Sequence, residues 1–232
     1  DLSDEIQKKF DDVSRKLDEA DRAHRALSAT VAIQETPWGR YWLFIPSQPT
    51  NILVIVHGSM AEDESADELA KRFIDRWVGF ARRERCLVIS PAFDRENYQA
   101  AYGGYRGLFG RQIGADEFVL RIVDQCRKYV KDFDGRFLLY GHSAGGQFAA
   151  RFAVKHHDRL EGVVLSAPGI YPFPTPLAAW PNGMGTLDRT LNWSETESQH
   201  VHYEPEPGSW VAAACLPLTV VVGAEDTMEQ PL

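Results

Sequence analysis

Short apolar runs alternate along the chain with segments in which apolar residues recur every three or four positions. Runs that are apolar at every position indicate strands buried on both faces, and the recurring pattern indicates amphipathic helices. The runs expected to form strands are 51–56, 86–90, 137–140, 163–166 and 218–222. Ahead of them, residues 31–33 and 41–45 flank a turn at 36–39, which predicts a β-hairpin.

The start of the chain carries the helical pattern most clearly. In residues 1–28, apolar residues such as Ile6, Phe10 and Val13 recur at steps of three and four between charged residues. Such a helix serves self-association or partner binding, or it packs on its own domain. The second interpretation is favoured, and residues 1–28 are treated as a unit separate from the rest.

Helices are also expected between the strands. They begin at the capping box formed by Ser65 and Glu68, at Asp116, and after Ser143. Because strands and helices alternate, the sequence predicts an α/β fold over residues 29–232, with a mostly parallel central sheet and helices on both faces.

Two segments of this domain lack a clear period. Residues 168–208 are rich in Pro, Trp and Gly, and a loop of that length in a compact domain is usually functional, so a lid-like insertion is predicted there. Residues 93–113 are irregular and contain several aromatic residues, which either line a site or cover the core. Those aromatic residues are Tyr98, Tyr102, Tyr105 and Phe109.

The composition narrows the range of partners. The chain has 232 residues, of which 44% are hydrophobic and 25% charged, as in a folded domain with a real core. Its net charge of -8 argues against nucleic acid and anionic membranes, because both favour a basic surface. No apolar run is long enough to span a bilayer. No metal-ligand cluster, phosphate loop or dinucleotide fingerprint appears, so no cofactor and no metal are expected.

The cysteines and the first residue bear on the compartment. Cys86, Cys126 and Cys215 lack zinc-ligand or redox spacing and are interpreted as buried small hydrophobic residues. The chain begins with Asp1 rather than Met, which leaves a removed signal peptide open, and two cysteines would be able to pair in a secreted protein. Between the two compartments, the cytoplasm is slightly favoured.

The strongest chemical signal is the sequence Gly-His-Ser-Ala-Gly at 141–145, which joins an apolar strand to a helix. A nucleophilic serine on such a turn sits in strained backbone, with its oxygen above the sheet edge. The neighbouring chain comes so close that Gly141 and Gly145 must lack side chains. The helix directs backbone N–H groups and a positive dipole end at the serine. Ser143 is therefore predicted to be a nucleophile, and the alternative is an ordinary tight turn.

Two further motifs follow apolar strands. His57, Gly58 and Ser59 follow the run at 51–56, and residues 223–226 follow the last one. The carboxyl ends of parallel strands meet at one edge of a sheet, where ligands bind. All three motifs are expected at that edge, and their convergence carries more weight than any one of them.

These residues resemble the α/β-hydrolase family, and the serine esterases and polyester-depolymerase or dienelactone-type hydrolases are the most similar members. The resemblance covers most of the chain. It implies that Ser143 attacks an acyl carbonyl and forms an acyl-enzyme. It also implies that the N–H of Ala144, with that of Ser59 or Met60, holds the oxyanion. Asp226 would orient and charge-stabilise a catalytic histidine.

The substrate is expected to be a small-molecule or polymeric ester. Peptidase or acyltransferase activity would use the same residues, and the sequence does not separate these activities from ester hydrolysis. Its aromatic or apolar group is inferred from the aromatic residues of the predicted lid. Arg106 and Arg111 either meet a substrate carboxylate or are solvated surface residues, and the second interpretation is favoured. The two histidines next to the motifs are interpreted as structural members of their turns rather than as bases. The residues assigned to substrate binding are His57, Tyr102, His142 and Trp180.

One departure from the family pattern is serious. The family order is serine, acid, histidine, and no histidine follows Asp226 here. The simpler expectation is a chain truncated after the acid-bearing strand, with the base beyond residue 232. If His200 or His202 in the predicted lid were the base, the histidine would precede the acid in the sequence, which is an unusual order for the family. The competing hypothesis is a non-catalytic binding or scaffold protein that kept the hydrolase fold and uses the N-terminal helix for interaction.

Overall fold

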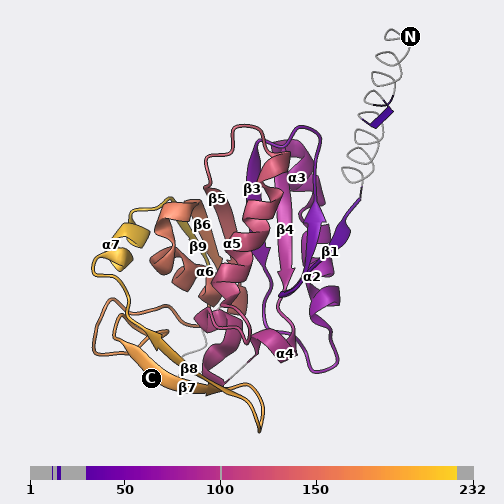
Figure 1. Cartoon of the computed structure of the whole chain (residues 1–232). Helices are drawn as coiled ribbons and strands as arrows, with labels where there is room; N and C mark the ends of the chain where they lie inside the picture. The colour runs from indigo at the N-terminus through magenta and orange to yellow at the C-terminus, as the bar shows by residue number, and fades with distance from the viewer. Residues whose placement is uncertain (1–11, 13–14, 17–29, 100, 224–232) are drawn as a thin grey trace, which may run out of the picture.

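A computed structural model describes residues 12, 15–16, 30–99 and 101–223, without the side chains of Ala101 and Tyr102. Its main element is a seven-stranded sheet in the order β1-β2-β4-β3-β5-β6-β9 (Figure 1). β2 pairs antiparallel with β1 and β4. The other neighbouring pairs in this order, β4-β3, β3-β5, β5-β6 and β6-β9, are parallel. The bounds are β1 Ala32–Thr36, β2 Gly39–Phe44, β3 Asn51–Val56, β4 Cys86–Ala92, β5 Phe137–His142, β6 Leu160–Ser166 and β9 Leu218–Val221.

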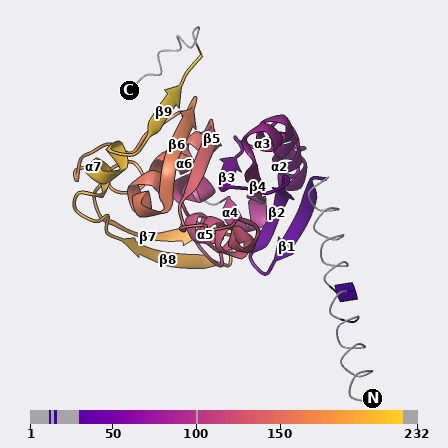
Figure 2. The same ribbon diagram turned by 90° about the horizontal axis from the view of Figure 1, so that it is seen from above.

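Helices cover both faces of this sheet, as the sequence predicts (Figure 2). Side chains of β3 show the division. Val54 and Val56 pack in one cluster with Phe148 of α6, whereas Ile55 packs in a second cluster with Phe73 of α2. A strand covered on both faces is apolar at successive positions, which explains the uninterrupted run. The helix bounds are α2 Ala66–Asp75, α3 Val78–Glu84, α5 Ala115–Cys126, α6 Ala144–Lys155 and α7 Ser209–Ala214.

The carboxyl ends of the parallel strands lie at one end of the molecule, together with the smaller elements (Figure 1). β3 pairs with β5 as far as Val56 and Gly141, and β6 pairs with β9 as far as Ser166 and Val221. The serine motif and the loop after β3 therefore leave the sheet side by side, as predicted. The smaller elements are α4 Arg95–Tyr98, the 3-10 helix η1 Ala101–Gly107, and the hairpin strands β7 Leu187–Asn192 and β8 Ser198–Tyr203.

Two element boundaries differ from the prediction. The helix after Ser65 has the predicted capping box but ends at Asp75, and α3 starts separately at Val78. β4 continues through Pro91 instead of stopping before it. Pro91 lies beyond Ile89, the last residue of β4 that pairs with β3, so it needs a partner strand on one side only.

The burial of two predicted core segments also differs. All four residues of β9 are exposed, because β6 flanks it on one side and no described strand flanks it on the other. Cys86 and Cys126 are buried as expected, whereas Cys215 is exposed, and all three are free thiols. The interpretation of Cys215 as a buried residue is therefore wrong.

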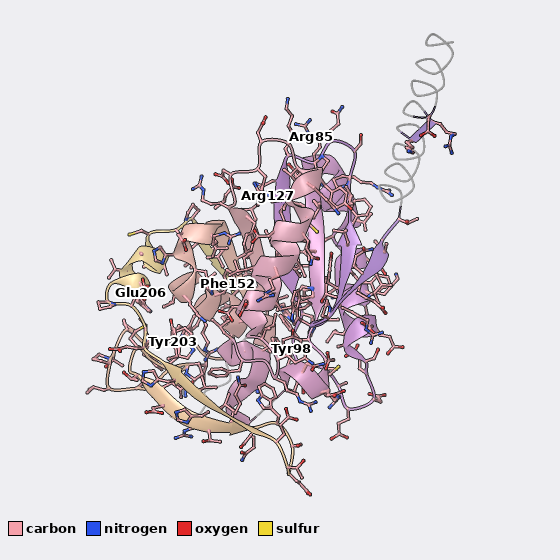
Figure 3. The ribbon with its side chains drawn as sticks, viewed as in Figure 1. Arg85, Tyr98, Arg127, Phe152, Tyr203 and Glu206 are labelled. Atoms are coloured by element: carbon pink, nitrogen blue, oxygen red, sulfur yellow. The ribbon has the colours of Figure 1, made fainter. Side chains whose placement is uncertain are left out.

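The described aromatic side chains of residues 93–113 are buried in the core, and Tyr105 also lines a cavity beside Ser59. Tyr98, Tyr105 and Phe109 are all buried in one cluster with α5 and α6 residues. The hydroxyl of Tyr98 donates to the carbonyl oxygen of Trp38 (2.8 Å). Figure 3 shows Tyr98 near the strand-end side of the molecule, with Arg85 and Arg127 at the opposite end. The side chain of Tyr102 lies outside the described part of the chain.

The segment 168–208 has more regular structure than its sequence predicts. It contains the β7–β8 hairpin, and Leu187 and Leu191 of β7 are buried in the main core cluster. The hairpin lies across the strand-end side of the molecule (Figure 1). Its role as a lid stays a prediction.

Of the predicted N-terminal helix, the structure describes Asp12, Arg15 and Lys16, which are helical. The remainder, and with it the predicted self-association surface, lies outside the described residues. None of the described helices has the length and apolar character needed to cross a bilayer. Among the described residues, no group of three or more His, Cys, Asp or Glu side chains is arranged to hold a metal ion.

Candidate active site

Ser143 occupies the strained turn between β5 and α6. Its backbone has φ 53° and ψ −113°, a conformation that costs a non-glycine residue about 1–3 kcal/mol. A Cβ on Gly141 would lie 2.8 Å from the nitrogen of Gly146. A Cβ on Gly145 would lie 2.6 Å from the carbonyl oxygen of His57. Real Cβ atoms essentially never approach that closely. The two glycines therefore permit the close packing that holds the turn in place.

The loop after β3 packs directly against this turn. A Cβ on Gly58 would lie 3.4 Å from the Cβ of Ser143, an ordinary contact distance. The hydroxyl of Tyr105 donates to the carbonyl oxygen of Gly58 (2.9 Å) and holds the loop from the η1 side. The next two residues are accessible, Ser59 being exposed and Met60 half-buried. The loop thus lies against the serine turn at Gly58, and the oxyanion role of Ser59 and Met60 stays a prediction.

His57 anchors this loop from inside the protein. The side chain is completely buried, its Nδ1 donates to the carbonyl oxygen of Gly58 (2.8 Å), and its Nε2 accepts from the N–H of Phe93 (3.4 Å). Burial lowers the pKa of His57 to about 4, so the ring is neutral near pH 7. This position agrees with the interpretation of His57 as a structural member of the turn and gives no support to a substrate contact.

His142 and Ser166 tie the serine turn to β6. Nδ1 of His142 hydrogen-bonds to Oγ of Ser166 (3.1 Å), and the N–H of Ser143 donates to the carbonyl oxygen of Ser166 (2.8 Å). His142 is half-buried, so part of its ring faces outward. The contact that the sequence predicts between His142 and a substrate stays a prediction.

Helix α6 starts at the serine. Ala144 is its first residue, and the N–H of Gln147 donates to the carbonyl oxygen of Ser143 (3.1 Å). The first N–H groups of a helix have no partner within the helix, and the dipole makes that end positive. The N–H of Ala144 is thus positioned next to the serine, where an oxyanion would need it.

Two further predicted site residues are Trp180 and Asp226. Trp180 is only 1% exposed, its Nε1 donates to the carbonyl oxygen of Gly107 (3.3 Å), and its ring packs on Tyr203. Trp180 is therefore a buried packing residue beneath the β7–β8 hairpin strands, and the prediction that it binds substrate is corrected. Asp226 lies outside the described residues, so its role stays a prediction.

The described histidines do not supply a base for Ser143. Nε2 of His156 binds Asp116 (2.7 Å), and His200 binds Asp188 (2.9 Å) on the exposed face of the hairpin. His156 is half-buried. Within the part of the chain that the structure describes, no side chain hydrogen-bonds the Ser143 hydroxyl.

The Asp116 cluster is a structural feature that sequence analysis missed. Asp116 is buried and binds both His156 and Lys155, each at 2.7 Å. Burial alone would raise the pKa of Asp116, but His156 and Lys155 outweigh it and lower the pKa below its ordinary value. The ion pairs connect the start of α5 to the end of α6.

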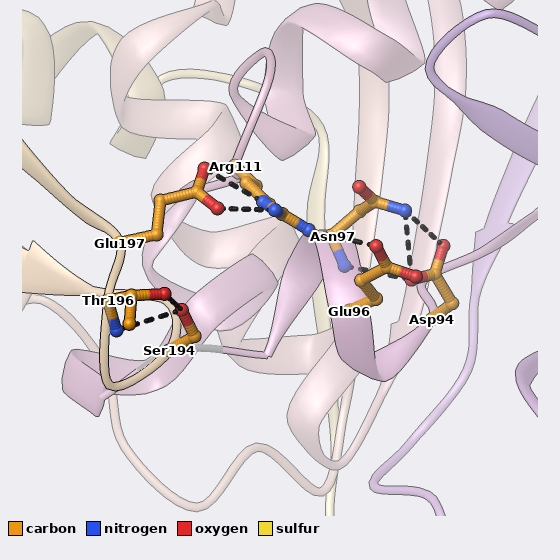
Figure 4. A network of polar contacts seen from close by, with 7 residues as sticks. All are labelled: Asp94, Glu96, Asn97, Arg111, Ser194, Thr196 and Glu197. Carbon is orange, nitrogen blue, oxygen red and sulfur yellow. Dashed lines mark hydrogen bonds and ion pairs between the residues drawn. The ribbon is translucent and has the colours of Figure 1, made fainter.

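Arg111 holds the β7–β8 hairpin in place (Figure 4). Its Nε donates to Oε1 of Glu197 (2.9 Å), its Nη2 also binds Glu197, and its Nη1 donates to Glu96 of α4 (2.8 Å). The Glu197 carboxylate raises the pKa of Arg111 above its ordinary value. The carboxylates of Glu197 and Glu96 therefore bind the Arg111 guanidinium, so Arg111 is neither a solvated surface residue nor available to bind a substrate carboxylate.

Two cavities share Gly103 and Arg106 among their lining residues. One has a volume of about 290 Å³ and is lined by Ser59 and Met60 together with Tyr105 and Arg106. The other has a volume of about 340 Å³ and is lined by Gln147, Arg151 and Ile170 among others, again with Arg106. Because Arg106 and Gly103 line both cavities, the two cavities lie next to each other.

Comparisons with known proteins agree with this fold. Residues 102–205 match the Hydrolase_4 family, described as serine aminopeptidase, S33. Poly(aspartic acid) hydrolase-1 from Sphingomonas sp. KT-1 is 22% identical with a TM-score of 0.63, and the match covers 86% of this chain and 72% of that one. LpqC, a poly(3-hydroxybutyrate) depolymerase from Bordetella parapertussis, is 18% identical with a TM-score of 0.62, over 89% and 72% of the two chains. No curated protein sequence matches the chain.

The strand order, the turn that carries Ser143 and these matches show that the chain has the α/β-hydrolase fold. Within that class, the match over residues 102–205 supports the serine hydrolases.

Proposed function

We propose that this protein is a serine hydrolase that cleaves carboxylic esters through an acyl-enzyme on Ser143. The observation that carries the proposal is the strained backbone of Ser143, at φ 53° on the first residue before α6. Strain of this kind persists only where the surrounding structure imposes it, and here two glycines and the loop after β3 do so. A strand-to-helix turn of this geometry exposes a serine oxygen above the sheet edge.

The reaction begins when Oγ of Ser143 adds to the ester carbonyl carbon and its proton passes to a general base. The carbonyl electrons move onto oxygen, and the N–H of Ala144 with that of Ser59 or Met60 stabilises the oxyanion, by roughly 3 kcal/mol for each donor. Collapse of the intermediate expels the alcohol, which takes the proton. Water then repeats the sequence on the acyl-enzyme and releases the acid.

The general base is proposed to be a histidine oriented by Asp226, following the resemblance to serine esterases. None of the histidines that the structure describes bonds to Ser143, and their own partners are Gly58, Ser166, Asp116 and Asp188. The proposal therefore assigns the base to a residue outside the described ranges.

The proposed substrate is a small-molecule or polymeric ester. The two similar structures are named as hydrolases of polymers, poly(aspartic acid) and poly(3-hydroxybutyrate). Apolar side chains lie exposed in the segment after β6, where Ile170, Tyr171 and Phe173 face outward. Such a surface suits a chain-like substrate with apolar segments.

A second candidate is a binding or scaffold protein that kept the hydrolase fold. The observation that favours it is the Ser143 hydroxyl, which no described side chain hydrogen-bonds. Removing one member of a triad costs several powers of ten in rate, so a chain without a base would turn over poorly.

Labelling with a fluorophosphonate probe separates the two candidates, with Ser143→Ala as the control. The probe is applied to the 232-residue chain and to the longest chain that its gene encodes. Labelling that disappears in the variant supports the hydrolase, and an ester panel then defines the substrate. Labelling of the longer chain alone places the base beyond residue 232. Absence of labelling in both favours the binding protein.

A further inference from the structure

A cationic side chain without a carboxylate partner is buried behind the serine turn. Arg151 of α6 is 2% exposed and donates to three backbone carbonyl oxygens, those of Pro181 (2.7 Å), Arg106 (3.1 Å) and Gln147 (3.2 Å). Among the described residues, no carboxylate lies within 4.0 Å of its guanidinium. Burying an unpaired charge costs several kcal/mol, so the absence of a counter-charge calls for a physical reason.

A second cation lies beside it. Arg106 of η1 lines the same cavity, and its Nε donates to the carbonyl oxygen of Gly103 (3.2 Å). It has no carboxylate within 4.0 Å among the described residues either. Burial and the charge of Arg106 lower the pKa of Arg151 to about 10, which leaves Arg151 charged near pH 7. The repulsion between them adds to the cost of keeping the cavity without an anion.

The walls of this cavity match an anion. Gln147 and Asn182 add side-chain amides to the two arginines, and among the described residues no Asp or Glu lines the cavity, although the chain has 33 acidic residues. Gln147 lies one helical turn after Ser143, and Arg106 also lines the cavity that reaches Ser59 and Met60. An anion beside Gln147 would therefore lie about one helical turn from Ser143.

We propose that this cavity binds a carboxylate of the substrate, and that the enzyme prefers esters carrying a carboxylate a few atoms from the scissile bond. Arg106 is the direct ligand because its outer guanidinium nitrogens have no described partner. Arg151 adds a second positive charge to the cavity. It also donates to the carbonyl oxygens of Arg106 in η1 and Pro181 in the 168–208 segment, and so connects these two segments. Guanidinium groups bind carboxylates in a bidentate manner, which gives direction as well as charge. The inference rests on the proposed function and names its substrate class.

The kinetic test uses two substrates with the same leaving group, 4-nitrophenyl hydrogen adipate and 4-nitrophenyl methyl adipate. They differ by one charge at the end of the acyl chain. We expect kcat/KM of wild type to be at least about tenfold higher for the acid, the effect of one hydrogen bond to a charged group. Equal values for the two substrates would overturn the proposal.

Variants then locate the preference. Arg106→Gln is expected to reduce the acid-to-methyl-ester ratio about tenfold or more, and Arg151→Gln to reduce it as well. Arg127→Gln is the matched control, because Arg127 is exposed at the opposite end of the molecule (Figure 3), and we expect it to keep the wild-type ratio. Damage to the fold would lower both rates together, so the ratio reports on recognition. An unchanged ratio in Arg106→Gln would contradict the assignment.

A binding measurement separates this inference from the proposed function. Ser143→Ala is titrated calorimetrically with adipate, and the same titration uses dimethyl adipate and inorganic phosphate. Adipate binding that disappears in Ser143→Ala/Arg106→Gln supports the carboxylate site even if the protein hydrolyses no ester. Phosphate binding of equal strength would indicate a general anion site and would refute specificity for substrate carboxylates. No adipate binding, with ester turnover intact, would refute the site and leave the hydrolase proposal standing.

Discussion

Replacing Gly145 by alanine tests the packing that holds the nucleophile. In α6 this substitution adds one methyl group at a buried position, 2.6 Å from the carbonyl oxygen of His57 and closer still to that of Val56. Both oxygens belong to backbone at the end of β3, which cannot rotate away as a flexible side chain would. We expect Gly145→Ala to push α6 from β3 and to displace Ser143.

The magnitude follows from two opposing terms. Alanine is favoured over glycine inside a helix by about 1 kcal/mol. A carbon needs about 0.7 Å more room at the His57 oxygen and still more at the Val56 oxygen, and overpacking of this kind costs about 1–3 kcal/mol or more. The overlap with two backbone oxygens places the cost at the upper end, so we expect a net loss of about 2 kcal/mol. For a domain of this size that corresponds to a Tm lower by roughly 4–8 °C.

The assay pairs Gly145→Ala with Gly79→Ala. Gly79 lies in α3, and a Cβ there would meet nothing within 4 Å, so the same substitution should stabilise by about 0.5–1 kcal/mol. Urea midpoints and fluorophosphonate labelling rates are measured for both variants and wild type. We expect Gly145→Ala to be less stable and to label slowly, and Gly79→Ala to be more stable and to label normally. A Gly145→Ala variant that matches wild type in both measurements would show that the close approach does not constrain the turn.

Three further predictions concern the surroundings of the site. His57 has a pKa of about 4 in the folded state and about 6.5 in the unfolded state, so between these pH values the unfolded state binds more protons. The free energy of unfolding should therefore rise by about 3 kcal/mol as the pH increases through that window. In urea titrations, His57→Gln should remove this pH dependence. Asp116→Asn should cost about 3 kcal/mol at pH 7, measured against the exposed control Asp124→Asn, because it leaves Lys155 and His156 without their carboxylate. Since those partners lower the pKa of Asp116, its contribution should be complete above the ordinary carboxyl pKa and be lost as the pH falls through the lowered value. Glu197→Gln should speed amide hydrogen exchange in β7 and β8 by weakening the bond to Arg111, and unchanged exchange would show that the hairpin is held by its apolar contacts alone.

The framework of the site was predictable because each part of it has a local cause. The strand before Ser143 is apolar, the serine is bracketed by glycines, and the following helix packs Phe148 and Phe152 inward. Each of these features constrains the backbone over a few residues, and together they determine the turn. The parallel pairing of β3 with β5 then places His57 and Gly58 beside it, which is why the strand-end argument succeeded.

The contacts between distant segments were not predictable in the same way. The sequence predicts that Trp180 binds substrate, whereas in the structure its ring packs on Tyr203 and its Nε1 donates to the carbonyl oxygen of Gly107. Nothing within a few residues of Trp180 reveals those partners. Arg151 did leave a signal, since it follows Phe148 by three residues on the buried side of α6, where a charged residue is rare. A buried charge on an apolar stripe therefore deserves a search for its partner.

The charge of the whole chain and the charge of the cavity lead to different expectations about ligands. A net charge of -8 argues against anionic surfaces as partners, because those respond to the field of the entire protein. At physiological salt the Debye length is about 8 Å, so distant acidic side chains act only weakly on an anion inside the cavity. Arg106 and Arg151 act at contact distance and in a region of low dielectric, where screening is weaker. An acidic protein can therefore select an acidic substrate, and raising the ionic strength should reduce adipate binding to Ser143→Ala less than it reduces any non-specific anion binding at the surface.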